Sequence, residues 1–250
     1  MAVLVIVPTY NEIDNIAMVV GRIKDALPQA SVLVVDDASP DGTAGAVRVL
    51  KDHHPDVHLL ERPGKAGLGS AYRVGFSWGL EHGYDVMVEI DADGSHDPAD
   101  LPQLVEAIRS GHELAIGSRY VAGGSIPNWK LHRHLLSKGG NRYASVVLGL
   151  GVADSTAGFR AYAGSLLARL ELGSVRAEGY GFQIEMTYRA RRVGASITEV
   201  PIRFVDRQLG ESKMSSKIVV EALLLVTWWG AGRLLSGAFR GGARRRAPRK

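Results

Sequence analysis

The chain of 250 residues contains no cysteine, and this absence excludes disulfide bonds, thiolate zinc sites and a cysteine nucleophile. It also fits a reducing compartment such as the cytoplasm. The eight histidines do not have the spacing of a zinc site.

Long apolar runs are absent as well. The N-terminus enters Ala2–Val7 without a basic region or a small-residue cleavage site, so a strand is expected there instead of a signal peptide. Near the C-terminus, Glu221 and Arg233 interrupt the apolar segment 218–239, and its charge-free core, Ala222–Gly232, is only eleven residues long. About 20 residues are needed to span a bilayer, so a membrane-spanning helix is not expected.

Positive charge is concentrated at one end of the chain. The net charge is +4, but six basic residues lie within the last eleven positions: Arg240, Arg244, Arg245, Arg246, Arg249 and Lys250. The rest of the chain is slightly acidic, whereas a nucleic-acid enzyme carries basic and aromatic residues across a groove face. A nucleic-acid partner is therefore not expected.

Apolar segments alternate with helical patterns. Five apolar segments predict strands: Val3–Val7, Val32–Val35, Val86–Ile90, Leu114–Gly117 and Ile197–Phe204. Helical spacing predicts helices over 13–27, Thr43–His53, Gly69–His82, Leu101–Ser110, Trp129–Leu150 and Phe182–Arg192. This alternation is typical of a doubly wound α/β domain with a mostly parallel sheet, which binds ligands at the carboxyl ends of its strands.

The run Asp91-Ala92-Asp93 follows the third predicted strand and carries the strongest chemical signal. Side chains at positions i and i+2 of an extended chain point the same way, so both carboxylates can face one pocket. Two neighbouring anions repel unless a cation lies between them, and carboxylate oxygens suit Mg²⁺ or Mn²⁺. A polar strand end with acidic turn residues is the alternative.

Polar residues also follow the first predicted strand. The Tyr10 ring is suited to stacking on a nucleobase, and Glu12 can accept hydrogen bonds from a base or a ribose. A helix N-terminus, capped by Asn11 or Asp14 with Glu12 in the first turn, explains the same residues.

The second predicted strand ends in Asp36-Asp37. A carboxylate here commonly meets the base or ribose of a nucleotide, and we assign that role to Asp37, whereas Asp36 and Asp41 are expected to be turn and cap residues. The loop Gly64–Gly69 lacks the glycine spacing of a P-loop. It is expected to be a tight loop that precedes a helix, and this loop can approach the ligand. His96 is expected to be a solvated turn residue, with a supporting place beside the carboxylates as the alternative.

Four basic residues flank polar turns: Arg119, Arg133, Arg207 and Lys213. Cations that face a carboxylate and metal centre suggest a substrate with more negative charge than one ion can neutralise, such as a phosphate or diphosphate. Surface ion pairs are the alternative for each of them taken singly.

Five segments occur in the order PTYNE, VVDDASPDGT, EIDADGSHDP, GSRY and FVDRQLGESK. Together they resemble the dolichol- and polyprenol-phosphate mannose synthases, which are inverting family-two glycosyltransferases. The likeness spans about residues 3 to 225, and FVDRQLGESK is its most discriminating part. The resemblance implies a single GT-A (Rossmann-like) domain, GDP-mannose as donor, Mg²⁺ or Mn²⁺ as cofactor, and a polyprenyl (dolichyl) monophosphate as acceptor.

Residue roles follow from the resemblance. The nucleoside would be held by Pro8, Tyr10, Glu12, Val35 and Asp37. The metal and diphosphate would be held by Asp91, Ala92 and Asp93, with the two aspartates as metal ligands. The donor would be bound by Arg119, Arg207 and Lys213. The acceptor phosphate would be bound by Arg119, Arg133 and Ser137. Some relatives have a glutamine metal ligand where this chain has Ser95, whose hydroxyl is a shorter and weaker ligand.

The implied reaction needs no dedicated base. A phosphate monoester has its second pKa near 6, so its oxygen is already a nucleophile at neutral pH. Asp93, Arg119 and Arg133 are the expected catalytic residues. Arg119 or Arg133 would align the acceptor phosphate opposite the leaving GDP. Arg207 or Lys213, together with the metal, would stabilise that leaving group. Single displacement would invert the α-mannosyl donor to a β-mannosyl phosphate.

The expected organisation is a glycosyltransferase domain over 1–217, a helix over 218–239 and a basic, disordered tail over 240–250. Trp228 and Trp229 suit a membrane interface, so the helix is expected either to lie in that interface or to pack on the domain. The tail would attract anionic lipids, which indicates a cytoplasmic protein bound peripherally to a membrane, with or without a membrane-anchoring partner. The alternative functions are a polyprenyl-phosphate glucosyltransferase that uses a UDP-sugar and a non-catalytic, nucleotide-binding membrane-scaffold subunit.

Overall fold

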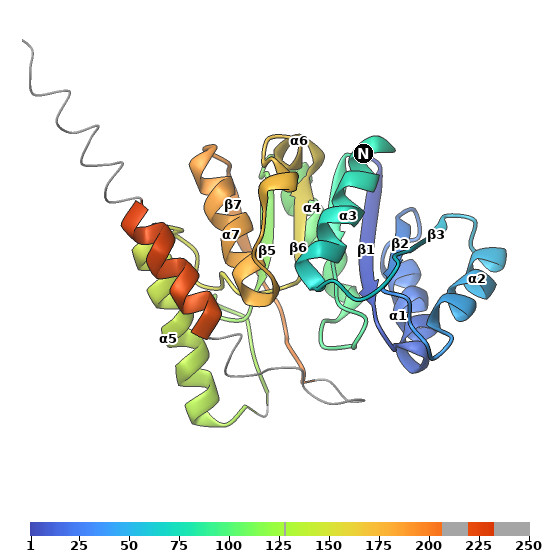
Figure 1. Ribbon diagram of the computed structural model, residues 1–250, viewed down its shortest axis with the longest axis horizontal. Coiled ribbons are helices and arrows are strands. Elements are labelled where there is room, and N and C mark those ends of the chain that lie inside the picture. Colours follow the sequence, from blue (N-terminus) through green and yellow to red (C-terminus); the bar gives the residue numbers. More distant parts are fainter. Residues whose placement is uncertain (128, 207–219, 233–250) are drawn as a thin grey trace, which may run out of the picture.

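The computed structural model describes residues 1–127, 129–206 and 220–232, and within them a single seven-stranded sheet forms the centre of the molecule (Figure 1). Its strands are β1 (Val3–Thr9), β2 (Ser31–Asp36), β3 (Val57–Glu61), β4 (Val86–Glu89), β5 (Leu114–Ser118), β6 (Arg160–Ala163) and β7 (Ile197–Pro201). Their order is β3-β2-β1-β4-β6-β5-β7. β6 runs antiparallel to both of its neighbours and the remaining pairs are parallel, so the predicted α/β class with a mostly parallel sheet is confirmed.

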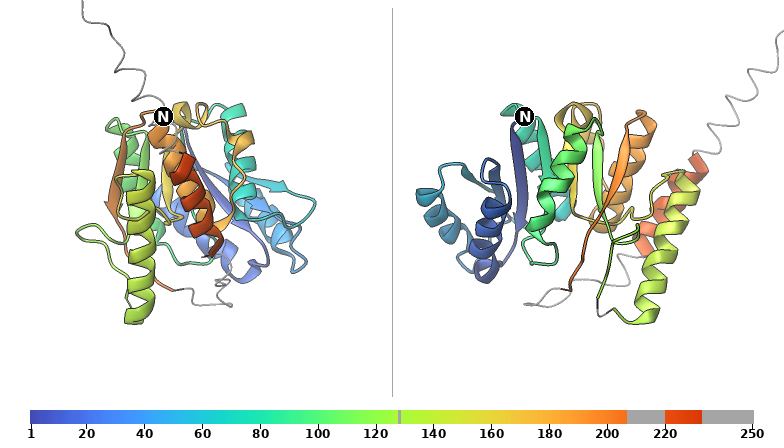
Figure 2. Two further views of the ribbon diagram at one scale, coloured as in Figure 1. Left: turned by 60° about the vertical axis from the view of Figure 1, so that its left-hand side comes forward. Right: turned by 180° about the vertical axis from the view of Figure 1, so that it is seen from behind.

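Helices cover both faces of this sheet. They are α1 (Ile13–Ala26), α2 (Thr43–His53), α3 (Leu68–Glu81), α4 (Leu101–Arg109), α5 (Leu131–Leu148), the short α6 (Gly164–Leu167) and α7 (Gly179–Arg192). Short 3₁₀ turns cover Pro98–Asp100 and Leu172–Ser174, and a further helix covers residues 220–232. In Figure 1 α3 and α7 lie in front of the sheet, and the reverse view of Figure 2 shows α1 and α4 on its other face.

The alternation of side chains along the strands explains why both faces are covered. On β1, Leu4 and Ile6 join the core under α3 and α7, whereas Val3, Val5 and Val7 join the core under α1 and α4. Burial on both faces accounts for the nearly continuous apolar runs in the parallel strands.

Glycine lets α3 approach the sheet closely. A Cβ atom built on Gly75 would lie 2.6 Å from Cγ2 of Ile6, and one built on Gly79 would lie 2.6 Å from Sδ of Met87. Both distances are too short for real side-chain carbons, so the backbone of α3 rests directly on β1 and β4 at these positions. This contact fixes the place of α3 relative to the end of β4.

The structure differs from the sequence prediction at three strands. β3 and β6 were not predicted, and β6 begins at the buried Arg160. β7 ends at Pro201, although a strand was expected to continue to Phe204. Instead, the chain beyond Pro201 forms isolated bridges, Ser125 with Arg203 and His96 with Phe204, because it leaves the sheet to cover the loop after β4.

The helix over 220–232 packs on the domain beside α5 and α7 (Figure 1). Ala222 and Val226 are buried, and the hydroxyls of Thr227 and Tyr143 are 2.9 Å apart. Leu224 and Trp228 on the same helix remain 66% and 77% exposed. This segment therefore has both a packed side and an open apolar side. Within the described ranges, none of the helices is long and apolar enough to cross a membrane.

Candidate active site

The two carboxylates of the DxD run lie at the carboxyl ends of β1 and β4. The amide of Ile90 donates to the carbonyl of Ile6, so the chain stays paired with β1 up to the residue before Asp91. Asp91 and Asp93 are half-buried and Ala92 between them is buried. This placement matches the ligand-binding edge predicted from the pattern of strands and helices.

Different parts of the molecule hold the two carboxylates. Oδ1 of Asp93 accepts a hydrogen bond from the amide of Ser95 in its own turn, at 3.0 Å. Oδ1 of Asp91 accepts from the hydroxyl of Tyr72 on α3, also at 3.0 Å. Burial, together with the nearby Asp91 charge, raises the pKa of Tyr72 well above its usual value, so this hydroxyl keeps its proton.

The donor set suits a hard divalent cation that shares its coordination with a substrate. In the described part of the chain, no group of three or more His, Cys, Asp or Glu residues could hold a metal ion. Mg²⁺ is commonly bound by only one or two carboxylates together with substrate phosphates. Asp91 and Asp93 provide two carboxylates at positions i and i+2, so the residues present fit such an ion.

The residues predicted to hold a nucleoside gather at the ends of β1 and β2. Pro8 and Val35 are paired across these strands, and the Val35 side chain is fully buried in the core. The ammonium of Lys65 lies 4.3 Å from the centre of the Tyr10 ring. The loop Gly64–Gly69 therefore lies beside the Tyr10 ring, the predicted platform for a nucleobase.

Asp37 forms a buried ion pair that the sequence analysis did not foresee. Its carboxylate accepts two hydrogen bonds from Arg62, at 2.6 and 2.9 Å, and both side chains are less than 10% exposed. Arg62 immediately follows β3, and its amide donates to the carbonyl of Asp36. Because β3 was not predicted, nothing in the sequence placed Arg62 next to Asp37.

The start of α1 differs from the cap that was expected. Glu12 occupies the N-cap position, in place of Asn11 or Asp14, and its carboxylate accepts from the side chain of Asn15 at 2.9 Å. The amide of Ile13 is bound by the carboxylate of Asp41 in the loop after β2.

The turn role predicted for Asp41 is confirmed, because its Oδ1 also accepts from the amide and hydroxyl of Thr43. The turn role of Asp36 is confirmed as well, because its carboxylate accepts from Thr9 and Ser39.

His96 is buried, so the expectation of a solvated turn histidine is wrong. It is 4% exposed and packs against the rings of Phe159 and Phe204, with centroids 5.1 and 5.3 Å away. Burial lowers the pKa of His96 to about 4, so the imidazole is neutral at physiological pH. The bridge that joins Phe204 to His96 could not be read from the sequence, because it links two irregular segments.

Arg119 lies in a buried ion pair, which excludes the alternative of a surface pair for this residue. Its Nε and Nη2 donate to the carboxylate of Asp154 at 2.7 and 2.6 Å, and its backbone amide donates to the same carboxylate. Burial raises the pKa of Asp154, but the Arg119 charge and these hydrogen bonds outweigh burial and leave it below its usual value. Asp154 was not singled out from the sequence.

Arg133 and Ser137 project from α5, one helical turn apart. Arg133 donates to Asp206 at 3.0 Å in a partly exposed ion pair and lies 4.0 Å from the centre of the Trp129 ring. The hydroxyl of Ser137 accepts from that of Tyr120 at 2.7 Å, and Tyr120 directly follows Arg119. The structure thus brings all three predicted phosphate-binding residues to one region, whereas Arg207 and Lys213 lie outside the described residues.

A pocket of about 80 Å³ opens beside these residues. Its polar lining comprises Trp129, Arg133, Ser137, Asn141, Thr156 and Tyr180, and its apolar lining includes Leu136, Ala144, Ile184, Ala222, Leu223 and Val226. The pKa of Tyr180 is raised, chiefly by burial, and it responds to the charges of Arg119, Arg133 and Asp91. Tyr180 therefore lines the cationic pocket and is near enough to Asp91 to respond to its charge.

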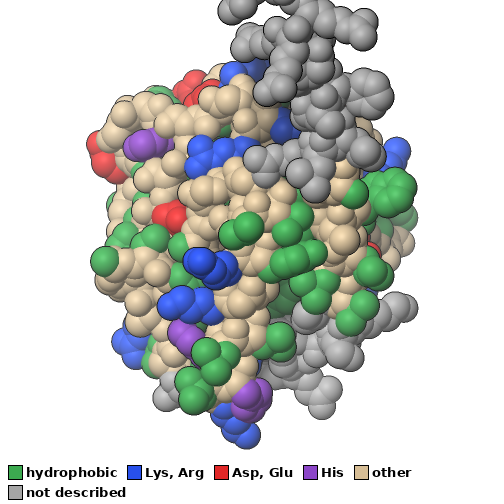
Figure 3. All heavy atoms as spheres, turned by 90° about the vertical axis from the view of Figure 1, so that its left-hand side faces the viewer, with side chains coloured by type: hydrophobic (Ala, Val, Ile, Leu, Met, Phe, Trp, Pro, Cys, Tyr) green, Lys and Arg blue, Asp and Glu red, His purple; other side chains and the backbone are tan. Residues whose placement is uncertain are grey.

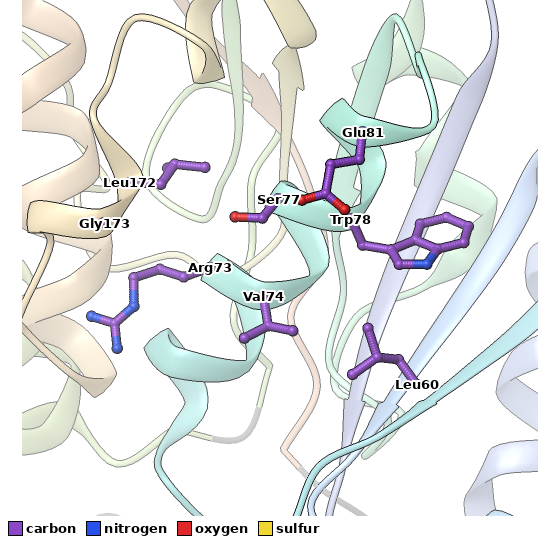
Figure 4. A pocket seen from close by; sticks show the side chains of 8 residues that line it. All are labelled: Leu60, Arg73, Val74, Ser77, Trp78, Glu81, Leu172 and Gly173. Atoms are coloured by element: carbon purple, nitrogen blue, oxygen red, sulfur yellow. The ribbon is translucent and has the colours of Figure 1, made fainter.

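A second pocket lies away from this region, on the outer side of α3 (Figure 4). Its lining includes Leu60 of β3 and Leu172, together with residues of α3, among them Arg73 and Trp78. The guanidinium of Arg73 is bound to the carbonyl of Val175 and the carboxylate of Glu178. This pocket contains none of the predicted site residues, so we assign it no part in the site.

Comparison with known proteins was made on the whole chain. The family described as Glycosyl transferase family 2 matches residues 4–170. The chain is 53% identical to an undecaprenyl-phosphate mannosyltransferase of Micrococcus luteus, over 92% of this chain and 94% of that protein. It is 52% identical to a polyprenol monophosphomannose synthase of Mycolicibacterium smegmatis, over 92% and 88%.

Solved structures share the fold at lower sequence identity. A mannosyltransferase from Pyrobaculum calidifontis, solved with GDP-mannose and Mn²⁺, has a TM-score of 0.58 and 19% identity, covering 99% of this chain and 76% of its own. A glucosyl-3-phosphoglycerate synthase from Mycobacterium tuberculosis, solved with Mn²⁺ and UDP, has a TM-score of 0.67 and 19% identity, covering 90% and 78%. At such identities these likenesses concern the fold alone.

Proposed function

The chain belongs to Glycosyl transferase family 2, and from this premise we propose that it transfers mannose from GDP-mannose to a polyprenyl monophosphate with inversion. Relatives with 52% and 53% identity over nine-tenths of the chain, which are a polyprenol monophosphomannose synthase and an undecaprenyl-phosphate mannosyltransferase, support the sugar and the acceptor. The observation that carries the proposal is the pocket in which Arg133 and Ser137 adjoin an apolar lining from α5, α7 and the helix over 220–232.

The acidic end is proposed to hold the donor. Asp91 and Asp93 would bind Mg²⁺ or Mn²⁺, which would neutralise the diphosphate and stabilise the leaving GDP. Tyr10 would stack on guanine, and the ion pair of Asp37 with Arg62 provides both acceptors and donors at the end of β2. Mn²⁺ in solved members of the fold is consistent with a divalent ion here.

The cationic pocket is proposed to hold the acceptor. Arg133 and Ser137 would bind the lipid phosphate, and Arg119 would lie beside it with a fixed orientation, because two of its nitrogens are bound to Asp154. The apolar lining from Leu136 and from the helix over 220–232 would cover the first part of the isoprenoid chain. A polar mouth with an apolar wall suits a molecule that has a phosphate at one end and a hydrocarbon at the other.

The acceptor lipid lies in a membrane, and an exposed apolar surface is proposed to meet it. Leu131, Leu135 and Val146 of α5 are 73%, 59% and 68% exposed, and Leu224 and Trp228 lie on the adjacent helix. Figure 3 shows this face of the molecule, where apolar and basic side chains lie close together. The sequence of α5 contains no Asp or Glu, so no carboxylate on that helix would repel anionic lipid headgroups.

The proposed reaction follows from these positions. An acceptor phosphate with a second pKa near 6 is largely dianionic at neutral pH, so no base is needed to activate it. Arg133 and Arg119 would align its oxygen toward the anomeric carbon. Attack from the face opposite the leaving diphosphate would form the new C–O bond as the bond to GDP breaks, and the product would be a β-mannosyl phosphate.

The test is transfer of radiolabelled mannose from GDP-mannose to a polyprenyl phosphate, with Mg²⁺ or Mn²⁺ and with EDTA. We expect label in a lipid that mild acid hydrolyses, only when metal is present, and a β anomeric configuration by NMR. A product of α configuration would contradict inversion. Transfer from UDP-glucose in place of GDP-mannose would overturn the donor, and no transfer from any donor would favour a non-catalytic subunit.

Two matched pairs of variants locate the site. Asp93→Asn should abolish metal-dependent transfer, whereas Asp52→Asn at the exposed end of α2 should not change it. Arg133→Met should raise the KM for the polyprenyl phosphate much more than the KM for GDP-mannose, whereas Arg109→Met, at the exposed last residue of α4, should change neither. Equal effects on both substrates would remove Arg133 from the acceptor site.

A further inference from the structure

The hydroxyl of Tyr72 contacts the side chain of Asp91, although Tyr72 lies on a helix that is separate from the DxD run in the sequence. Tyr72 lies on α3 with 0% of its surface exposed, and its hydroxyl donates to Oδ1 of Asp91 at 3.0 Å. A buried tyrosine hydroxyl needs a partner, and here the partner is a residue proposed to bind metal. The contact therefore bears on the geometry of the proposed metal site.

Two helices hold the Tyr72 ring in place. It stacks on Phe182 of α7 with an interplanar angle of 10° and on Phe76 of α3 with an angle of 25°. Phe182 lies against the backbone of α3, because a Cβ atom on Gly69 would be 2.9 Å from its ring. The position of the Tyr72 hydroxyl is thus set by the packing of α3 against α7, and it does not depend on solvent.

The other side of Asp91 meets the loop before β6. A Cβ atom built on Gly158 would lie 3.7 Å from Oδ2 of Asp91 and 3.8 Å from Nε2 of Gln183. Gln183 in turn donates to Glu89 at 2.8 Å, in the core below the site. Asp91 therefore lies between Tyr72 on one side and the backbone of this loop on the other.

The carboxylate torsion of an aspartate is broad and roughly two-fold, so packing alone does not fix which oxygen points where. For Asp93 the amide of Ser95, in the same turn, provides a hydrogen bond. For Asp91 the corresponding donor is a side chain 19 positions earlier in the chain. Partners of this kind orient metal ligands, and their loss typically weakens metal affinity by about 10- to 100-fold.

We propose that Tyr72 is a positioning residue for Asp91: its hydroxyl fixes the rotation of the carboxylate that binds the divalent cation beside the donor diphosphate. The proposal rests on the proposed function only in that a nucleoside diphosphate and a divalent cation bind at the DxD run. It does not depend on the sugar or on the acceptor.

The experiment compares wild type with Tyr72→Phe, which keeps the stacked ring and removes only the hydroxyl. The affinity for GDP is measured by calorimetry with Mn²⁺ and again with EDTA, in the full chain and without acceptor. We expect the gain in GDP affinity that Mn²⁺ provides to fall by about 10- to 100-fold, whereas the affinity with EDTA stays unchanged. Mn²⁺ binding followed by electron paramagnetic resonance should show the same loss.

The matched control is Tyr162→Phe, which removes the hydroxyl of an equally buried tyrosine on β6. Tyr162 is paired with Met87 inside β4, and its hydroxyl forms no hydrogen bond with Asp91, so its variant should keep the wild-type response to Mn²⁺. Tyr72→Phe is expected to fold, because Asp91 is only half-buried and water can replace the lost donor.

Two results would overturn the proposal. One is a wild-type response to Mn²⁺ in Tyr72→Phe, and the other is an equal loss of GDP affinity with Mn²⁺ and with EDTA, which indicates a general effect on the fold. Tight, Tyr72-dependent binding of GDP and Mn²⁺ in a chain that transfers no mannose would refute the proposed function and leave this inference standing. If wild type binds GDP no better with Mn²⁺ than with EDTA, both fail.

Discussion

The buried ion pair of Arg119 with Asp154 provides a test of stability at a residue proposed to act in catalysis. Both side chains are less than 10% exposed, and the Asp154 carboxylate accepts hydrogen bonds from two guanidinium nitrogens and one backbone amide. Asp154→Ala would leave the Arg119 charge buried without its counter-charge. We therefore expect a large loss of folding free energy from this single change.

The magnitude follows from the burial of the pair. Removing one partner of a buried ion pair typically costs about 3–5 kcal/mol, which is a large part of the roughly 5–15 kcal/mol that separates folded from unfolded protein. In a chain of this size each kcal/mol lowers Tm by about 2–4 °C, so Tm should fall by about 6–20 °C. The exposed pair of Arg48 with Glu61, whose side chains are 57% and 50% exposed, is the control. There, Glu61→Ala should cost less than about 1 kcal/mol.

The assay is urea unfolding followed by circular dichroism, with the thermal midpoint as a second measure. A double variant, Arg119→Met with Asp154→Leu, should be more stable than Asp154→Ala, because it leaves neither charge unpaired. A loss in Asp154→Ala no larger than that in Glu61→Ala would refute the reasoning. So would a double variant less stable than Asp154→Ala alone.

The same pair predicts the response to acid. The folded-state pKa of Asp154 lies below its usual value of 3.8, because the Arg119 charge and hydrogen bonds outweigh burial. Its contribution to stability is therefore complete above the unfolded pKa and is lost as pH falls through the lowered folded value.

Three further predictions concern other parts of the chain. Burial lowers the pKa of His96 from 6.5 to about 4 in the folded state. The unfolded chain therefore binds more protons between these pH values, and the free energy of unfolding should fall by about 3 kcal/mol as pH drops from 6.5 to 4. His96→Phe should remove most of this pH dependence of the urea midpoint, and an unchanged pH dependence would contradict the prediction. Gly75→Ala, where a Cβ would be 2.6 Å from a core side chain, should lower the free energy of unfolding by about 1–3 kcal/mol. Gly45→Ala, with open space around it in α2, should raise it by about 0.5–1 kcal/mol. Equal stability of the two variants in calorimetry would be inconsistent with this reasoning. Replacing the exposed Leu224 and Trp228 by serine should weaken flotation with anionic vesicles without lowering Tm, and undiminished flotation would exclude that surface.

The sequence predicted those parts of the fold whose signal is local. The run Val86–Ile90 followed by Asp91 and Asp93 combines an apolar strand with a polar end, so its place at the edge of the sheet could be inferred from a few adjacent residues. The helices on both faces were found for the same reason, because their apolar residues recur at helical spacing.

Strands without a strong apolar signal were missed. β3 is a short edge strand in which His58 and Glu61 interrupt the apolar residues. β6 begins with Arg160, which is fully buried and donates to the carbonyls of Ser155, Ala157 and Gln183. Arginine is rarely buried, so a sequence prediction places it in a turn at the surface.

Partners that are distant in sequence could not be predicted at all. Tyr72 is 19 positions from Asp91, and Arg119 is 35 positions from Asp154. Each pair is brought together by the packing of helices and loops on the sheet, which local patterns do not specify. The two carboxylates of the DxD run and their place at the sheet edge were therefore predictable from adjacent residues, whereas the side chains that contact them became visible only in the fold.

The antiparallel strand β6 has a consequence for the synthesis of this protein. β4 pairs with β1 on one side and with β6 on the other, yet β6 begins at Arg160, long after β4 ends at Glu89. At about 5–20 residues per second, a ribosome takes roughly 4 to 14 seconds to make the intervening chain. During that interval β4 is an open edge of the nascent sheet, with unpaired backbone groups beside buried-type valines, which is a template for wrong pairing between chains. The open edge of β4, the strand that precedes the DxD run, is thus a part of the newborn protein that needs protection from such pairing.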